Sequence, residues 1–513
     1  MRSLPRVATA AVVRNRWISL ITIAALALYL LVSLTRHRSY LTDGYDLGIF
    51  DQVVRAYAHF KAPISPLKGQ GYNIYGDHFH PIIALLAPLY WLWDNPCSLL
   101  IGQSLVMAVA VPVVYRFARR RTSEPMALVI STALAVGWPV LSLVDFDFHE
   151  IAFATPLMAL AIDALDRRDD RKLLLWSGLL LLVREDMGVL LVVLGVLVFC
   201  RGGWSAIRAR GRSLMRFPLL SLVLVVAGVL GYKITTAIVL PHFAPNHQFA
   251  YWQYQTLGKN LPDAVVNIIT HPWHAIEEFF TPSLKSQTLA YFFIPLLFLP
   301  LRSPYALLSL PIFAERFYNS RESKEYLWST HWQYNALPWL ILVLAAVDGA
   351  ARLGLFRTGK GPDLFSRIFA VWLLVVPVFL AFWSNGATPR PPNPIRRLAG
   401  SAWDTTDRLK SQRAAAAFVP SNVCVEADDR IVTHLTSRDY ASLPGMQHGA
   451  ADFVVLDLSE DNVGNFGPSP QQIEREDRAA GYTEVFRRTT MLVLRSPHYA
   501  GPTDECRPLG RGR

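Results

Sequence analysis

The sequence predicts an all-α polytopic membrane bundle of about eleven helices, some short or broken, followed by a small C-terminal α/β domain on the outer face. The composition points to a membrane protein, because 52% of the 513 residues are hydrophobic, only 17% are charged and the mean hydropathy is +0.27. Soluble domains are less apolar and more charged. A Pro-rich stretch after Asn385 marks where the membrane part ends.

The formal net charge of +11 comes from Lys and Arg residues that stand in short clusters between apolar runs. Dispersed clusters of this kind are topology signals rather than a nucleic-acid surface, because basic loops stay in the cytoplasm. The clusters lie at 2–16, 116–121, 167–172, 201–216 and 352–367. With all of them inside, the N-terminus is cytoplasmic and the C-terminal domain is extracytoplasmic.

The apolar segments that satisfy this alternation are 17–35, 96–117, 125–144, 149–166, 173–184, 187–200, 217–240, 287–301, 304–317, 335–351 and 366–385. The first is long enough to cross a hydrocarbon layer of roughly 30 Å and lacks a small-residue cleavage site, so we expect a retained span. The fifth and sixth are too short to cross and meet at Arg184-Glu185-Asp186. Such broken helices are expected to end in a water-filled cavity.

The chain is predicted to divide into a membrane domain, a Pro-rich linker and an extracytoplasmic α/β domain, at 1–385, 386–398 and 399–513. In the last domain we expect two buried strands, a polar helix and a hairpin, at 423–426, 452–458, 470–480 and 483–495. Cys424 and Cys506 both fall in this domain, where the compartment permits a disulfide, but the sequence leaves their pairing open.

Ionisable residues gather in four segments that the predicted topology brings to the outer side, namely 45–52, 77–81, 145–150 and 184–186. Each charge costs about 2.5–3.5 kcal/mol at membrane depth, so their clustering is a functional-site hypothesis. Asp46 and Asp51 are the candidate catalytic carboxylates. They are five residues apart, so only one of them can face a cavity if the segment is helical. For Asp46 the alternative is a helix N-cap.

Asp77, His78 and His80 have the residue types of a metal site, although Asp-His-x-His matches no strong zinc signature. Imidazolium groups at His78 and His80 would equally hold a phosphate, which makes them candidate substrate ligands. The alternative is a polar loop that re-enters the membrane at Pro81. Asp77 is a candidate metal ligand.

Asp147, His149 and Glu150 alternate with phenylalanines as an extended segment would, or they cap the next helix. We take Asp147 as a second candidate metal ligand, and His149 and Glu150 as candidate substrate ligands. Arg184 and Glu185 join the substrate-binding set, because Arg captures phosphate bidentately. The alternative is a salt-bridged joint between two short helices.

At these motifs the chain resembles a "domain of unknown function" family of polytopic bacterial membrane proteins. The resemblance covers most of the chain and rests on 45–52, 76–81, 146–150, 184–186 and 429–438. More distantly, the layout resembles the GT-C class of integral-membrane glycosyltransferases, which use polyprenyl-phosphate sugars and carry an acidic residue in the first outer loop. The resemblance implies a bacterial plasma-membrane protein.

The GT-C resemblance implies that Asp46 is a general base, that sugar transfer inverts the anomeric carbon and that a lipid phosphate leaves. Arg184, a histidine or a divalent cation such as Mg²⁺ or Mn²⁺ would stabilise the departing phosphate. The chain departs from the class in one respect. It has no Asp-x-Asp pair in the first loop, and the clean pair is Asp145-Phe146-Asp147 after the third span, so the metal requirement stays open.

The leading hypothesis is therefore a membrane glycosyltransferase that uses a polyprenyl-phosphate-linked sugar at the outer leaflet. Its expected partners are this lipid-linked sugar and membrane lipid, and we expect no nucleic acid to bind. One alternative is a polytopic transporter or flippase for a lipid-linked or anionic substrate, for which broken helices with buried charge are also typical. Another is a non-catalytic envelope assembly protein. The lack of a visible repeat of two halves in hydropathy favours the enzyme.

Overall fold

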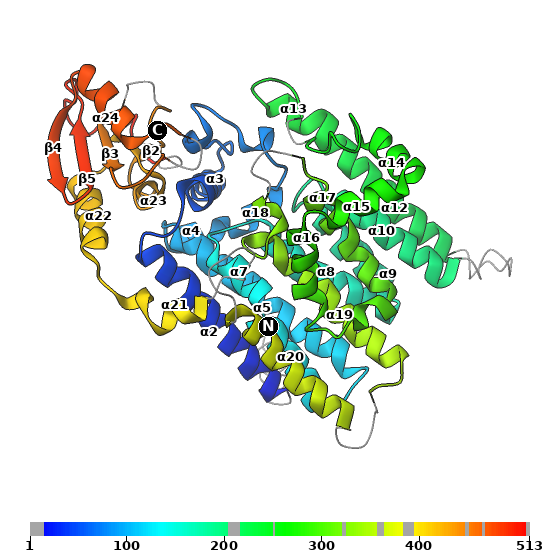
Figure 1. Ribbon diagram of the computed structural model, residues 1–513. Helices are drawn as coiled ribbons and strands as arrows, with labels where there is room; N and C mark the ends of the chain where they lie inside the picture. Colours follow the sequence, from blue (N-terminus) through cyan, green and yellow to red (C-terminus); the bar gives the residue numbers. More distant parts are fainter. Residues whose placement is uncertain are drawn as a thin grey trace, which may run out of the picture.

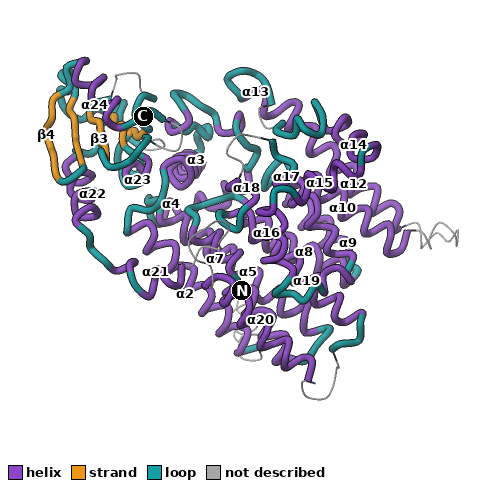
Figure 2. The backbone as a smooth tube through the Cα atoms, in the orientation of Figure 1, coloured by secondary structure: helices purple, strands orange, loops and turns teal. Residues whose placement is uncertain are grey.

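The computed structural model describes residues 15–203, 216–249, 252–320, 325–356, 364–382, 394–446, 451–463 and 467–508. Helices build a large body, and a small sheet stands to one side of it (Figure 1; Figure 2). Five of the described helices are long and apolar enough to cross a membrane: Arg16–Arg38, Cys97–Arg119, Glu124–Asp145, Pro218–Phe243 and Glu325–Arg352. A helical membrane body is thus confirmed, whereas the number eleven stays a prediction, because the other apolar helices are shorter.

The helices of the body are α2 Arg16–Arg38, α3 Ile49–Ala58, α4 Ala87–Leu92, α5 Cys97–Arg119, α6 Glu124–Val136, α7 Trp138–Asp145, α8 Ile151–Arg167, α9 Asp170–Leu180, α10 Met187–Val198, α12 Arg216–Ile234, α13 Leu240–Phe243, α14 Leu261–Thr270, α15 Pro272–Phe280, α16 Ser283–Phe293, α17 Leu310–Phe317, α18 Glu325–Trp328, α19 Ala336–Arg352 and α20 Leu364–Phe382. Each predicted apolar segment overlaps at least one of them. The expected break between short helices is present, since α9 ends at Leu180 and α10 begins at Met187.

Small residues let α10 and α12 touch backbone to backbone. A Cβ added at Gly188 would lie only 2.5 Å from the Gly228 carbonyl oxygen, and one added at Gly228 would meet the Gly188 carbonyl oxygen in the same way. Membrane helices associate through close packing of this kind, because lipid leaves little hydrophobic driving force between them. The pair therefore forms one tight unit of the body.

Ion pairs join the helices at the end of the bundle that the topology prediction places in the cytoplasm. Asp163 of α8 accepts hydrogen bonds from Arg116 and Arg120 of α5, at 2.6 and 2.7 Å. Asp348 of α19 accepts from Arg352 at 2.6 Å. These ion pairs involve arginines of the basic clusters that the topology prediction assigns to the cytoplasmic side of the membrane.

The C-terminal part holds a five-stranded sheet with the order β2-β1-β3-β5-β4. Its strands are β1 Cys424–Ala427, β2 Tyr440–Ser442, β3 Phe453–Asp457, β4 Thr483–Arg488 and β5 Met491–Arg495. Strands β2, β1 and β3 are parallel, and β5 runs antiparallel to both β3 and β4. The accompanying helices are α21 Pro394–Ala399, α22 Asp407–Phe418, α23 Asp429–Val432 and α24 Pro470–Ala479.

The predicted strands, polar helix and hairpin of this part are all present, whereas the strand β2 and the helices α21, α22 and α23 were not expected. Apolar residues cover both faces of the sheet, since Val425, Val455 and Val493 belong to one buried cluster and Leu456 and Leu492 to another. Most of the predicted linker, 386–393, lies outside the described residues, and its last residues belong to α21.

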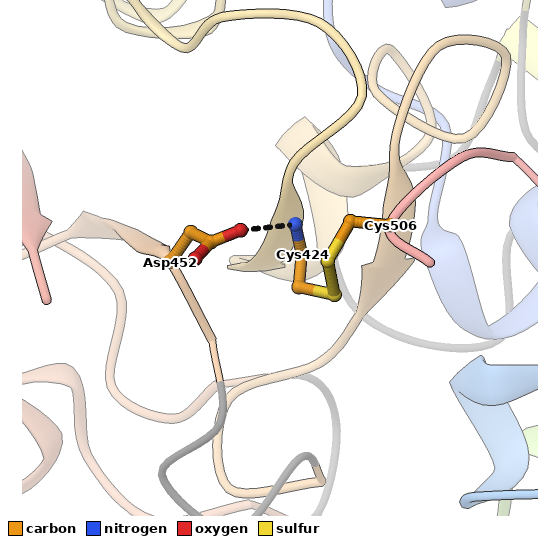
Figure 3. Close-up of side chains that lie close together, drawn as sticks. All are labelled: Cys424, Asp452 and Cys506. Carbon is orange, nitrogen blue, oxygen red and sulfur yellow. Dashed lines mark hydrogen bonds between the residues drawn. A yellow bond between two sulfur atoms is a disulfide. The ribbon is translucent and has the colours of Figure 1, made fainter. Parts of the chain in front are cut away.

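A disulfide joins Cys424 in β1 to Cys506 near the end of the chain (Figure 3). The backbone N–H of Cys424 also donates to the Asp452 carboxylate at 2.9 Å. These three side chains are close enough to suggest a metal site, but zinc binds thiolates, and here both sulfurs are spent in the disulfide. The group is therefore a structural cross-link.

Candidate functional site

The first loop, residues 39–96, leaves α2 and begins with a π-helical turn, Gly44–Gly48, that carries Asp46 and runs directly into α3. Leu47 in this turn and Val53 in α3 are completely buried, so an apolar face holds the segment against the rest of the chain. The residues at the N-cap positions of the turn and of α3 are Asp43 and Gly48. Asp46 is therefore not a helix cap.

Three carboxylates from two distant segments meet beside this turn. One oxygen from each of Asp43, Asp46 and Asp147 lies within 4.8 Å of the others. Asp147 is fully buried, forms an ion pair with Arg36 at 3.0 Å and accepts the Asp43 backbone N–H at 2.6 Å. Its backbone has φ of +49°, an unusual conformation for a non-glycine residue at a turn between α7 and α8.

His149 faces the same cluster. Its Nε2 lies 3.8 Å from Oδ1 of Asp46, its side chain is 7% exposed, and this nitrogen makes no hydrogen bond with any described residue. Burial and, to a smaller extent, the charge of Arg184 lower the pKa of His149 to about 3, so the ring is neutral at physiological pH. A buried nitrogen without a partner calls for an explanation, and an absent ligand is one.

The carboxylates repel one another. Burial raises the pKa of Asp46 well above its ordinary value, and the charges of Asp147, Asp43 and Asp429 raise it further, whereas Arg36 opposes the shift. Burial also raises the pKa of Asp147 to about 7, against the effect of Arg36. Three carboxylates and a neutral imidazole are a donor set that suits Mg²⁺ or Mn²⁺, and a cation would relieve their repulsion.

A second charged cluster is centred on Arg184, in the turn between α9 and α10. Its guanidinium donates to both carboxylate oxygens of Asp186 at 2.7 and 2.6 Å, and to Glu315 of α17 at 3.3 Å. Glu150 lies 3.8 Å away. The positive charge of Arg184 thus lies among three carboxylates, those of Asp186, Glu315 and Glu150.

The neighbouring Glu185 pairs with His78 of the first loop, with Oε1 2.7 Å from Nδ1. Glu185 also accepts the Phe79 backbone N–H at 3.2 Å. Burial alone would lower the pKa of His78, but Glu185, with smaller effects of Asp77 and Glu150, raises it to about 9. The predicted substrate-binding residues His78 and Glu185 are therefore an ion pair at neutral pH.

The adjacent residues His149 and Glu150 link the two clusters, because His149 lies 3.8 Å from Asp46 and Glu150 lies 3.8 Å from Arg184. Tyr334 lines a pocket together with Arg184 and Glu315. Beside it, the ring of Phe146 stacks on His149 and meets Trp332 edge to face, with ring centroids 5.2 and 4.2 Å apart. Asp46, His149, Glu150, Arg184 and Glu185 thus belong to one continuous region.

A larger and mostly apolar cavity adjoins this region. It lies between α10, α12, α14 and α17, and Glu185, Asp186 and Glu315 stand at its charged part. Asp186, Ile312 and Glu315 line both cavities. On the far side of α14, Ile269 is 71% exposed, and Trp273 of α15 is 80% exposed, as expected for helices that face lipid.

Three predicted site residues lie elsewhere. Asp51 is fully buried, with both oxygens accepting from Arg55 at 2.7 and 2.9 Å and one of them from the Tyr90 hydroxyl at 2.7 Å. Asp77 forms an ion pair with Lys68 at 3.0 Å rather than joining Asp147. His80 is buried against the Phe50 ring. These contacts are those of residues that stabilise the fold.

The sequence reasoning missed Asp43, Glu315, Tyr334 and Asp429. Asp43 stands three residues before Asp46, a spacing that brings side chains to one face of a helical turn and was therefore readable. Glu315 is an ionisable residue next to an apolar run, as Arg184 is, but it stands out less clearly in the sequence. Asp429 begins one of the motifs on which the family resemblance rests, 429–438, but the sequence reasoning gave it no role in the site. No local pattern marks Tyr334.

A protein-family model described as "Predicted membrane protein (DUF2079)" matches residues 36–482. No curated protein matches the sequence. Among solved structures, the chain is similar to ArnT from Cupriavidus metallidurans bound to undecaprenyl phosphate, with a TM-score of 0.51, 15% identity, and coverage of 95% of this chain and 100% of that one.

The apo state of the same ArnT gives a TM-score of 0.48 and 13% identity, covering 94% of this chain and 98% of that one. The oligosaccharyltransferase of Archaeoglobus fulgidus in complex with Zn and sulfate gives 0.38 and 12% identity, covering 85% of this chain and 68% of that one. At this identity the first match shows the fold alone, a GT-C-like membrane fold, and it confirms the layout that the sequence predicted.

Proposed function

The chain belongs to the DUF2079 family of membrane proteins, and we propose that it is a glycosyltransferase that takes a sugar from a polyprenyl-phosphate carrier. One observation carries the proposal. The Asp46 carboxylate stands beside the unpartnered Nε2 of His149, in a region that continues through Glu150 and Arg184 to a large apolar cavity. A reactive carboxylate next to space for a lipid chain suits a lipid-linked substrate.

The apolar cavity between α10 and α14 would hold the polyprenyl chain, and Arg184, which lines the smaller adjoining pocket with Asp186 and Glu315, would hold the phosphate. Arginine binds phosphate bidentately, and the long contact from Arg184 to Glu315 is the one that an incoming phosphate would replace. The similar ArnT structure contains undecaprenyl phosphate, which is a ligand of this class.

Asp46 acts as the general base. It accepts the proton of an acceptor hydroxyl, whose oxygen then attacks the anomeric carbon from the face opposite the phosphate, and this inverts the configuration. Burial and the neighbouring carboxylates raise the pKa of Asp46, which makes it a stronger base than an ordinary aspartate. Arg184 stabilises the negative charge on the departing lipid phosphate.

Asp43, Asp147 and His149 would hold a divalent cation next to Asp46, and Mg²⁺ or Mn²⁺ suits their oxygen-rich donor set. Such a cation supplies Lewis-acid stabilisation of phosphate charge when it is bound. Asp46 then serves as the base within the same cluster, while Arg36 balances part of the negative charge of Asp147.

We place the reaction at the outer leaflet of the plasma membrane, with the N-terminus in the cytoplasm. The arginines of the opposite end, Arg116 and Arg120 among them, support this orientation by the positive-inside rule. The Cys424–Cys506 disulfide supports an extracytoplasmic C-terminal domain, because disulfides persist in oxidising compartments.

The test uses the full chain in lipid nanodiscs, with a panel of polyprenyl-phosphate sugars as donors and native membranes as the acceptor. We expect release of polyprenyl phosphate with at least one donor, and its loss in both Asp46→Asn and Asp46→Ala. Asp77→Asn, in the same loop but paired with Lys68, is the matched control and keeps its activity. Full activity in both Asp46 variants removes the base assignment, and no turnover of any donor removes the proposed function.

A flippase is the second candidate, favoured by the short helices α9 and α10 that meet at a charged turn beside a lipid-sized cavity. It predicts movement of undecaprenyl phosphate between leaflets in proteoliposomes without any sugar transfer. Asp46→Asn separates the two functions, because a general base is dispensable for lipid movement.

A further inference from the structure

The π-helical turn that carries Asp46 begins with backbone amides that its own N-cap residue leaves unbonded. The first N–H groups of any helix lack partners within the helix. The N-cap residue here, Asp43, makes no capping hydrogen bond with its side chain. Its backbone N–H instead donates to Asp147, on the other side. The backbone N–H of Tyr45, in the turn itself, donates instead to a residue that is distant in the sequence.

Asp429, the first residue of α23, supplies the missing acceptor. Its Oδ1 accepts the Tyr45 N–H at 2.9 Å, across a sequence separation of 384 residues. A negative charge at the beginning of a helical turn is favourable as well as a hydrogen-bond acceptor. Asp429 therefore caps the Asp46 turn from the C-terminal domain.

Gly44 is what lets α23 come this close. A Cβ at this position would overlap Cγ1 of Val432 and would lie 3.2 Å from Oδ1 of Asp429 and 3.3 Å from its carbonyl oxygen. Any larger residue would push the turn away from α23. The glycine and the aspartate are thus two halves of one contact.

Other contacts fasten α23 and the residues after it to the first loop on both sides of the turn (Figure 1). His434 stacks on the rings of His37 and Tyr40, with centroids 4.1 and 3.6 Å away. Beyond the turn, Arg55 donates to the Thr436 carbonyl at 2.9 Å. The docking of the domain therefore does not depend on Asp429, whereas the backbone of the turn does.

We infer that Asp429 is a positioning residue that caps the π-helical turn and so fixes Asp46 against His149, which makes the C-terminal domain part of the active site. This inference rests on the proposed role of Asp46 as the base. A shift of about 1 Å at a reacting group costs on the order of 100-fold in rate. Asp429 touches neither substrate nor cation in this account and acts only through the turn.

The test compares Asp429→Ala, Asp429→Asn and Asp428→Ala in the full chain in nanodiscs. Asp428 is the matched control, because its carboxylate accepts the Asp457 N–H at 2.7 Å within its own domain. Hydrogen exchange of peptides that cover 42–48 reports the cap directly. We expect exchange about fivefold to thirtyfold faster in Asp429→Ala, no change in Asp428→Ala, and protection restored in Asp429→Asn, whose amide oxygen still accepts.

The kinetic arm separates positioning from stability. In Asp429→Ala we expect kcat to fall at least about tenfold, with KM for the polyprenyl donor and the melting temperature unchanged, and with rescue by Asp429→Asn. Gly44→Ala is a second variant that disturbs the same contact from the other side and is expected to lower kcat in the same way.

Unchanged exchange over 42–48 in Asp429→Ala overturns the inference. An equal loss in Asp429→Ala and Asp428→Ala, accompanied by a lower melting temperature, also overturns it, because it indicates a general role in folding. If the wild-type protein transfers no sugar, the proposed function fails, and the exchange result alone decides whether Asp429 caps the turn.

Discussion

The Nε2 atom of His149 lies 3.8 Å from Oδ1 of Asp46 and has no hydrogen-bond partner in the described part of the chain. We expect metal-free protein to bind Mn²⁺ here, as measured by electron paramagnetic resonance. His149→Ala should weaken Mn²⁺ binding by at least about tenfold. His80→Ala is the control, since His80 also has a buried nitrogen without a hydrogen bond but packs on Phe50. Equal Mn²⁺ affinity in the wild type and His149→Ala would contradict a cation site.

Asp46 and Asp51 of the first loop should differ in how their replacement by alanine changes thermal stability. Asp51→Ala leaves the fully buried Arg55 guanidinium without its main partner, which destabilises a protein by about 3–5 kcal/mol. Asp46→Ala removes a carboxylate that its neighbours repel, so its thermal unfolding temperature should equal or exceed that of the wild type. Differential scanning fluorimetry in detergent measures both, and an equal loss in the two variants would refute the division of roles.

Arg184→Lys should weaken the binding of undecaprenyl phosphate by about tenfold, because an ammonium cannot hold Asp186 bidentately and a phosphate together. The measurement is ligand binding to the purified chain in nanodiscs. Arg120→Lys, at the opposite end of the bundle, is the control and should bind the lipid normally. An unchanged dissociation constant in Arg184→Lys would count against phosphate capture.

Filling the apolar cavity should exclude the lipid chain. Ala264 of α14 lines the cavity, so Ala264→Trp is expected to abolish undecaprenyl phosphate binding by occupying that space. Val266→Trp on the same helix adds the same group on a side that is 59% exposed and should leave binding intact. Normal binding in Ala264→Trp would show that the lipid enters elsewhere.

The His78–Glu185 pair should make stability depend on pH. Because the pKa of His78 is raised from 6.5 to about 9 in the folded state, its contribution is complete below about pH 6.5 and is lost as the pH rises through 9. The melting temperatures of the wild type and Glu185→Gln should therefore differ at pH 6 and converge above pH 9. Asp166→Asn is the control, since its arginine partners Arg120 and Arg121 stay charged over this range. A gap that is constant with pH would contradict the assignment.

The helices could be predicted from the sequence, because apolar runs mark the segments that lie in the membrane and basic clusters mark the loops on its cytoplasmic side. The division between Asp46 and Asp51 was also partly readable. Only one of them was expected to face a cavity, and Arg55, four residues after Asp51, is at the spacing of a helical ion pair. The sequence therefore contained the reason why Asp51 points away from the site.

Other parts of the site depend on contacts that no local pattern records. Asp429 reaches Tyr45 across most of the chain, and Tyr334 joins the pocket around Arg184 only once α7 and the turn before α19 have packed. Asp77 had the residue type of a metal ligand, but Lys68 neutralises it in the folded protein. Long-range pairing of charges is thus what a single sequence fails to specify.

The contact between Gly188 and Gly228 has a consequence for how a bulky lipid enters. With carbonyl oxygens of one helix seated against the other, α10 and α12 have no room to slide or to separate in part. They form one fixed wall of the cavity. Arg184, just before α10, also hydrogen-bonds to Glu315 of α17, so we expect α14 rather than α17 to move when a bulky lipid enters.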